Sequence, residues 1–212
     1  MNAIFSWYLI RQGIGRLIRK SIFFLCLLPM GGCDVSFFSK PFHAVDVTAQ
    51  FEYADFQLID FKGKFRKLAD FRGKVVVLFF GYTHCPIVCP TTLADLAQVM
   101  RLLGKDAERV QVLFITVDPE RDDPELLAKF VPYFYPSFLG LYGDAGATAL
   151  AAKSFGVEYE KQFYKNKGGY TMLHSDGTFV IGAKGKPVLL SRYGQQAELL
   201  AQDIKQLLDR DR

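Results

Sequence analysis

The chain has 212 residues, of which 50% are hydrophobic and 23% charged, so a disordered, collagen-like or polytopic membrane protein is not expected. This length predicts a single domain that buries a sizeable core without disulfide staples. The formal net charge of +4 equals the charge of four basic residues within the first 20, and no acidic residue precedes Asp34. The remainder is balanced, which argues against a nucleic-acid-binding surface.

Residues 1–33 are predicted to be a secretory signal of the lipoprotein type. A basic stretch, Arg11 to Lys20, precedes an apolar run, Ile22 to Met30, and two glycines stand directly before Cys33. This arrangement resembles a bacterial lipobox, so Cys33 would become the lipidated first residue of the mature protein and Cys26 would be discarded. Cleavage without lipidation and retention as an uncleaved anchor are the alternatives, although the apolar run is shorter than the about 20 residues that span a membrane.

The sequence therefore predicts three parts: a signal at residues 1–33, a tether without clean periodicity at 34–55, and a folded domain at 56–212. We expect export to the periplasmic face of a bacterial inner membrane, with a lipid anchor in the membrane surface. An oxidising compartment lets Cys85 and Cys89 form a disulfide, so a thiol reductant is an expected partner wherever the function needs free thiols.

Alternating strand and helix patterns follow along the domain. Predicted strands cover residues 56–61, 65–68, 75–80, 110–117, 138–142, 170–173, 178–181 and 188–191, and predicted helices cover 90–103, 125–134, 145–155 and 195–208. The uninterrupted apolar run at 75–80 indicates a central strand buried on both faces. Asp123 and Pro124 are typical of a helix N-cap and first turn. The last three strands are expected to pair around a turn at 182–185.

This order predicts an α/β fold in which a central mixed sheet is flanked by helices. A cysteine pair directly after the first central strand, at the start of a helix, suggests by analogy a thioredoxin-like fold. If Cys85 begins that helix, Cys89 lies on the same helical face, about 6 Å further along the axis. That spacing is within the reach of a disulfide bond.

The two thiols suit three roles: binding of a soft metal, thiol–disulfide exchange, or a passive staple. A helix N-terminus stabilises the thiolate form of a cysteine. At least Cys85, of the two cysteines, should therefore be a better nucleophile and metal ligand. A staple is disfavoured because so short a loop gains little from being closed. A metal needs a third ligand, and three histidines follow the signal: His43, His84 and His174.

The three histidines differ in their surroundings. His43 lies in the predicted tether, where we expect a solvated side chain. His84 adjoins the first cysteine at the point where the chain leaves a strand, so we expect it to tune the thiolate rather than bind the metal. His174 follows a predicted strand, from which its side chain can reach over the cysteine helix as a ligand. The alternative is a surface or capping histidine.

Three segments resemble the Sco/SenC family of thioredoxin-like copper proteins, which are tied to the assembly of cytochrome c oxidase. The segments are Phe80 to Leu93 with the sequence FGYTHCPIVCPTTL, Val117 to Asp122 with VDPERD, and the pair His174-Ser175. The resemblance extends from about residue 56 to the C-terminus, and the CxxxCP motif with its flanks makes it specific.

This resemblance implies copper, as Cu(I) or Cu(II), bound by Cys85, Cys89 and His174. It also implies a partner in the oxidase subunit that carries the copper centre. Two thiolates and an imidazole form a soft site that suits Cu(I). Zinc accepts the same ligands, so the ligand set alone does not choose the metal.

The resemblance also draws attention to residues around the expected site. Where the family usually has acidic residues, this chain has Ile87 and Leu173, and we hypothesise that this loss of charge alters copper affinity or partner recognition. Met172 offers a weak thioether contact or simple packing. The loop that contains Asp118 is expected beside the metal, with Asp118 supporting a ligand or partner; the alternative is a solvated loop in which Asp123 caps the next helix.

Three functions fit these features. The leading interpretation is a membrane-tethered metallochaperone that is not itself an enzyme and needs all three expected ligands. The alternative is a thiol–disulfide oxidoreductase that reduces the oxidase or another exported protein and needs only the two cysteines. A peroxiredoxin-like or redox-sensing role is less well supported, because no threonine and arginine have a recognisable placement for a peroxidatic site.

Overall fold

The computed structural model describes residues 40–51, 53–165 and 168–210. Contacts divide the chain after Lys40, and every element below belongs to the unit Pro41–Arg212. The predicted signal and its Cys33 lie outside the described residues. Within those residues, no helix has both the length and the apolar character needed to cross a membrane.

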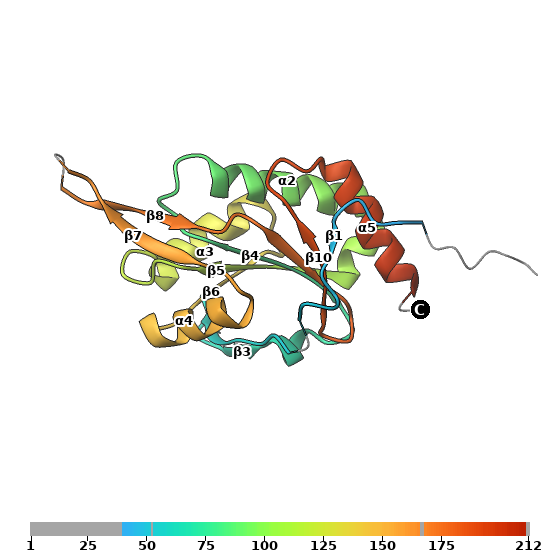
Figure 1. The fold of residues 1–212 in the computed structure, drawn as a ribbon, viewed down its shortest axis with the longest axis horizontal. Helices are drawn as coiled ribbons and strands as arrows, with labels where there is room; N and C mark the ends of the chain where they lie inside the picture. Colours follow the sequence, from blue (N-terminus) through green and yellow to red (C-terminus); the bar gives the residue numbers. More distant parts are fainter. Residues whose placement is uncertain (1–39, 52, 166–167, 211–212) are drawn as a thin grey trace, which may run out of the picture. The chain divides into compact units, whose positions relative to one another are not determined.

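An eight-stranded mixed sheet forms the centre of this unit (Figure 1). Its strands, in spatial order, are β1 (Val45–Asp46), β10 (Pro187–Ser191), β9 (Thr178–Ile181), β4 (Val75–Gly81), β5 (Val110–Thr116), β6 (Leu139–Tyr142), β2 (Gln57–Asp60) and β3 (Phe65–Lys67). The pairs β4–β5 and β5–β6 are parallel, and all other neighbours are antiparallel. The mixed sheet predicted from the sequence is confirmed.

The two central strands place the candidate site. All seven residues of β4 are buried, as expected of a β-branched and aromatic run in the middle of a sheet. Their parallel register runs from Val75 opposite Val110 to Gly81 opposite Thr116. Because both strands end at the same edge, the loop after β4 and the loop after β5 begin side by side.

Helices cover both faces of the sheet. They are α2 (Val88–Leu103), α3 (Pro124–Phe134), α4 (Ala145–Ser154) and α5 (Ala197–Arg210), together with the short 3-10 helices η2 (Leu68–Phe71) and η3 (Gly104–Arg109). The crossovers β4–α2–β5 and β5–α3–β6 step in the same direction, which puts α2 and α3 on one face, where α2 also contacts α5. Helix α4 contacts β2 and lies toward the other face (Figure 1). As predicted, Asp123 caps α3 by accepting a bond from the Leu126 amide at 2.7 Å.

A second, two-stranded sheet extends away from the first (Figure 1). It pairs β7 (Tyr159–Phe163) with β8 (Tyr170–His174) in antiparallel register. The expected pairing of β8 with the strands that follow it is therefore wrong; only β9 and β10 pair around the predicted turn. The partner strand β7 was not predicted because its sequence, YEKQF, is mostly polar and exposed. Since Tyr159 lies opposite His174, the histidine stands at the base of this hairpin.

Part of the predicted tether belongs to the fold. Strand β1 pairs with β10, and both Ala44 and Val47 are buried. The carboxylate of Asp203 on α5 accepts hydrogen bonds from the backbone amides of His43 at 2.9 Å and Ala44 at 2.8 Å. The folded unit therefore begins before residue 56, and a strand of two residues is too short to leave a periodic signal in the sequence.

We predict that Asp203→Asn destabilises the protein by about 1–3 kcal/mol, because the amide NH₂ of asparagine would face one of the two backbone donors that the carboxylate now accepts. Urea unfolding measures this change. Glu198→Gln on the exposed surface of α5 removes the same charge and should shift stability by less than about 0.5 kcal/mol. Equal effects of the two substitutions would contradict the anchoring role of Asp203.

Candidate metal centre

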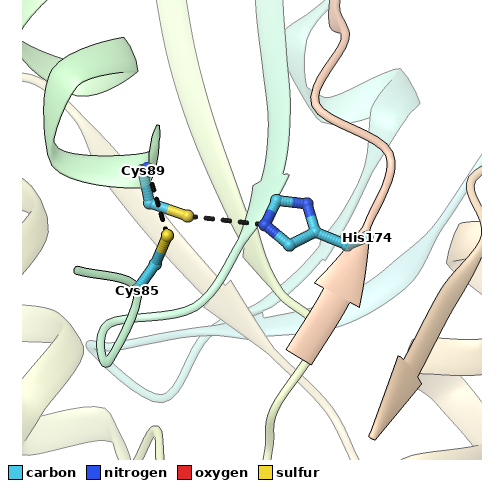
Figure 2. A group of neighbouring side chains, drawn as sticks. All are labelled: Cys85, Cys89 and His174. Carbon is cyan, nitrogen blue, oxygen red and sulfur yellow. Dashed lines mark hydrogen bonds between the residues drawn. The ribbon is translucent and has the colours of Figure 1, made fainter. Parts of the chain in front are cut away.

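Cys85, Cys89 and His174 come together at the edge where β4 ends. Their ligand atoms all lie within 4.8 Å of one another. Figure 2 shows the sulfur of Cys89 directed toward the imidazole and that of Cys85 directed toward Cys89, with the cysteines beside the start of α2 and the histidine at the end of β8. Both cysteines are free thiols. The structure thus brings together the three residues that the resemblance singled out.

Cys89, the second residue of α2, is completely buried. Its sulfur fits there because the last residue of β4 is Gly81: a Cβ atom at that position would lie 3.0 Å from Cys89 Sγ and 2.8 Å from Cε2 of Phe114. Burial raises the pKa of the Cys89 thiol well above its usual range, and the nearby charge of Cys85 adds to this effect. The thiol of Cys89 is therefore protonated at neutral pH in the metal-free protein.

Cys85 stands ahead of the helix and does not begin it. Helix α2 starts at Val88, and Pro90 occupies its third position, where no amide donor is lost. Burial acts to raise the pKa of Cys85, but hydrogen bonds from the backbone amides of Cys89, Ile87 and Val88 outweigh it and lower the pKa. The amide of Cys89 lies 3.5 Å from Cys85 Sγ. The free amides of the first helical turn therefore favour a thiolate at Cys85.

The imidazole of His174 is held in one tautomer. Its Nδ1 lies 2.8 Å from the carbonyl oxygen of Ser175, which only accepts, so Nδ1 carries the proton. The other nitrogen, Nε2, then presents a lone pair to Cys89 Sγ at 3.6 Å. Edge-on contacts with Phe79 and Tyr82, at centroid distances of 6.2 and 5.8 Å, fix the ring plane. A histidine oriented by its own loop is suited to metal binding.

Asp118 contacts the histidine hairpin rather than the sulfur atoms. Its buried carboxylate accepts a hydrogen bond from the Tyr170 hydroxyl at 2.8 Å and pairs with Arg121. Burial and the bond to Asp118 raise the pKa of Tyr170 to about 12, so the phenol stays a neutral donor. Tyr170 is the first residue of the strand that ends at His174. Asp118 therefore acts on the site through β8.

A second buried aspartate on the same loop, Asp122, contacts the cysteine segment. It accepts hydrogen bonds from the Thr83 amide at 3.0 Å, the Thr83 hydroxyl at 2.6 Å and the Thr116 hydroxyl at 2.6 Å. His84 is about half exposed, and its Nδ1 contacts the Thr83 hydroxyl at 3.0 Å and lies 3.6 Å from Asp122. The described contacts of His84 thus go to these two residues and not to a thiol.

The sequence reasoning assigned no role to Thr83, Asp122, Tyr170 or Gly81. Gly81, Thr83 and Asp122 carried a signal, since all three stand in segments that resemble the family, whereas Tyr170 does not. Their pairing depends on the β4–β5 register, which places the two loops side by side.

The remaining residues near the site lie as follows. Met172 is buried and packs in the core. Ile87 and Leu173, at the two positions where the resemblance leads us to expect acidic residues, are 64% and 51% exposed. His43 is exposed, and its Nε2 lies 3.2 Å from the side-chain oxygen of Gln202. None of these three exposed side chains belongs to the Cys85, Cys89 and His174 cluster found among the described residues.

Comparison with known proteins agrees with this geometry. The family model SCO1/SenC matches residues 46–209. Over 155 residues, 71% of this chain and 60% of the relative, the chain is 39% identical to the mouse protein named "Protein SCO2 homolog, mitochondrial". The chain therefore spans about three fifths of the length of that relative.

Solved structures of Sco proteins are also similar, among them the two that follow. The copper-bound ScoI of Bradyrhizobium japonicum is 38% identical with a TM-score of 0.67, and the match covers 73% of this chain and 98% of that one. The apo Sco1 of Thermus thermophilus is 39% identical with a TM-score of 0.68, over 79% and 96% of the two chains. These likenesses confirm the thioredoxin-like fold. Because the family model matches well over half of its length, the chain belongs to the SCO1/SenC family.

Proposed function

We propose that this protein binds copper through Cys85, Cys89 and His174 and delivers it to the copper centre of a respiratory cytochrome c oxidase. The observation that carries the proposal is the cluster itself: two sulfur atoms and an imidazole Nε2 lie within 4.8 Å, and the histidine tautomer already presents its lone pair. This donor set is soft and suits Cu(I). Family membership and the copper-bound relative from Bradyrhizobium japonicum support the choice of metal.

The shape of the site favours delivery over permanent storage. Three protein ligands leave room for an incoming ligand from an acceptor. Cys85 and His174 are only half-buried, so an acceptor can approach them from solvent. A resident metal that only stabilises a fold is more often enclosed by four protein ligands.

Export and anchoring are part of the same proposal. The basic stretch, the short apolar run and the two glycines before Cys33 support a lipoprotein signal in residues 1–33. We place the protein at the periplasmic face of a bacterial inner membrane, with a thiol reductant and the copper-carrying oxidase subunit as partners. The mouse relative is named as mitochondrial. For this chain, the signal-like residues 1–33 support the bacterial compartment instead.

A specific observation also favours a second function, thiol–disulfide exchange. A thiol of lowered pKa, Cys85, lies next to a buried thiol, Cys89. In such an exchange the Cys85 thiolate attacks a substrate disulfide, and Cys89 loses its proton and displaces the second substrate thiol. The substrate is reduced to two thiols, and the cysteine pair leaves as a disulfide that an exported thiol reductant restores. This reaction does not need His174.

We predict tight one-to-one binding in an anaerobic Cu(I) titration against a competing chelator. The titration uses the full chain with Cys26→Ser and Cys33→Ser, called the two-thiol background. Cys85→Ser or Cys89→Ser should abolish tight binding because a neutral hydroxyl replaces a soft thiolate. His174→Ala should weaken binding by about tenfold or more.

A matched control exists for the histidine. His43→Ala removes an exposed imidazole outside the cluster and should leave the affinity unchanged. Weak binding that is indifferent to His174, together with ready disulfide exchange, would instead favour the oxidoreductase.

We predict that iodoacetamide alkylates Cys85 before Cys89 in the reduced, metal-free two-thiol background. The pKa of Cys85 is lowered, so its thiolate forms at a lower pH than that of an unperturbed cysteine, and its alkylation rate rises there too. The pKa of Cys89 is raised, so its alkylation should stay slow until strongly alkaline pH. Mass spectrometry of peptides from a pH series measures both rates, and equal reactivity of the two thiols would contradict the assignment.

We predict that Ile87→Asp and Leu173→Asp change Cu(I) affinity or the rate of copper transfer. Both side chains are exposed beside ligand residues, so a carboxylate at either position adds negative charge near the cation without removing a ligand. Ile87→Asn and Leu173→Asn are polar but uncharged controls. Unchanged affinity and unchanged transfer to an acceptor in both aspartate variants would refute the hypothesis that these positions tune the site.

A further inference from the structure

The three expected ligands come from two separate parts of the structure. The cysteines follow β4 in the eight-stranded sheet, whereas His174 ends β8 in the two-stranded sheet. In the described residues, β8 pairs only with β7, so no strand ladder joins it to the larger sheet. The distance between the sulfur atoms and the imidazole therefore depends on the short connection from His174 to β9 and on side-chain contacts. One of these contacts is direct: the hydroxyls of Tyr82 and Thr171 lie 2.9 Å apart.

One face of the loop after β5 holds the histidine hairpin. The Asp118 carboxylate accepts a hydrogen bond from the Tyr170 hydroxyl at 2.8 Å. Arg121 pairs with Asp118, donates from Nη1 to the Tyr170 carbonyl oxygen at 3.0 Å, and stacks its guanidinium over the Tyr170 ring at 3.7 Å. Glu120 forms an ion pair with Lys161 of β7 at 2.6 Å. The contacts of Asp118 and Arg121 with Tyr170 are more buried than the ion pair between Glu120 and Lys161.

The last residue of this loop, Asp122, holds the cysteine segment. The Asp122 carboxylate accepts from both the amide and the hydroxyl of Thr83, two residues before Cys85. Its third bond, from the Thr116 hydroxyl, ties it to the end of β5. Asp122 is 1% exposed, so these bonds are shielded from water.

We propose that the loop Val117–Asp122 sets the spacing between the sulfur atoms and the imidazole, with Tyr170 as a positioning residue for His174 and Thr83 as a positioning residue for Cys85. Asp118 holds the histidine hairpin through Tyr170, and we call these contacts the histidine arm. Asp122 holds the cysteine segment through Thr83, and we call these contacts the cysteine arm. This inference rests on the proposed copper binding by Cys85, Cys89 and His174.

The test for the histidine arm is Tyr170→Phe in the two-thiol background. It removes the hydroxyl bond to Asp118 and keeps the ring against Arg121, so the fold should tolerate it. Cu(I) affinity should fall by about tenfold, as is typical when a group that orients a metal ligand is lost. In a His174→Ala background, the same substitution should change affinity by less than about twofold, because the ligand that Tyr170 positions is absent.

Two further measurements separate positioning from general destabilisation. In Cu(II)-loaded protein, Tyr170→Phe should move the thiolate-to-copper absorption and the electron paramagnetic resonance spectrum toward those of His174→Ala. Tyr164→Phe removes a hydroxyl from an exposed residue of the same hairpin and should alter neither the affinity nor the spectrum.

The cysteine arm has its own variants. Thr83→Val removes the hydroxyl bond to Asp122, and the resulting loss of Cu(I) affinity should persist in the His174→Ala background. Thr83→Ser retains the hydroxyl and should restore the affinity.

An unchanged affinity and spectrum in Tyr170→Phe, or an equal loss with and without His174, would overturn the inference while leaving copper binding intact. Failure of the two-thiol background itself to bind Cu(I) would overturn the proposed function, and this inference with it.

Discussion

The sulfur atom of Cys89 lies in an apolar pocket at the end of β4, beside Gly81 and Phe114, and this burial gives the site its character. Burial disfavours the charged thiolate form of this side chain, so the thiol keeps its proton in the metal-free protein. A bound cation would reverse that preference, because its charge compensates the thiolate directly. Metal uptake is therefore coupled to the release of a proton from Cys89. The lowered pKa of Cys85 favours a thiolate there, so this sulfur loses its proton more readily than that of Cys89.

The remaining elements place a second and a third donor around this sulfur. The free amides at the start of α2 stabilise the thiolate of Cys85, and the carbonyl oxygen of Ser175 orients the imidazole of His174. Neither uses an acidic side chain. The carboxylates of Asp118 and Asp122 stand one step further back, where they bond to the chain segments and not to the donors. The site thus has positioned donors, and no carboxylate among the described contacts bonds to a donor atom directly.

Sequence patterns predicted the parts of the fold that depend on uninterrupted apolar runs. Strands β4 and β5 follow from such runs, and the cap at Asp123 follows from its position before Pro124. Strand β7 did not, because its residues are held by pairing with β8 and by contacts such as Lys161 with Glu120, which leave no periodic signal. The sequence placed the helix at 90–103, or from Cys85 onward, whereas α2 begins at Val88; its N-cap, Ile87, makes no side-chain cap bond that local sequence could signal.

The candidate site shows the same division. Residue chemistry and spacing singled out Cys85 and Cys89, but spacing alone left His174 open, and the family resemblance was needed to select it. The pairing of Thr83 with Asp122 joins positions 39 residues apart through strand register, which no local pattern contains. Sequence thus predicts donors well and their supports poorly, since the supports depend on which loops become neighbours.

The unequal exposure of the three donors has a consequence for the path of ligand exchange. Cys89 is closed off by the core, whereas Cys85 and His174 are half open to solvent. If the protein delivers copper as proposed, an approaching acceptor would meet the two open donors first, and it would reach the buried sulfur only after one of them had been released. In the hand-over that we propose, the imidazole or the outer thiolate would therefore be exchanged early, and the inner thiolate would be the last ligand to leave.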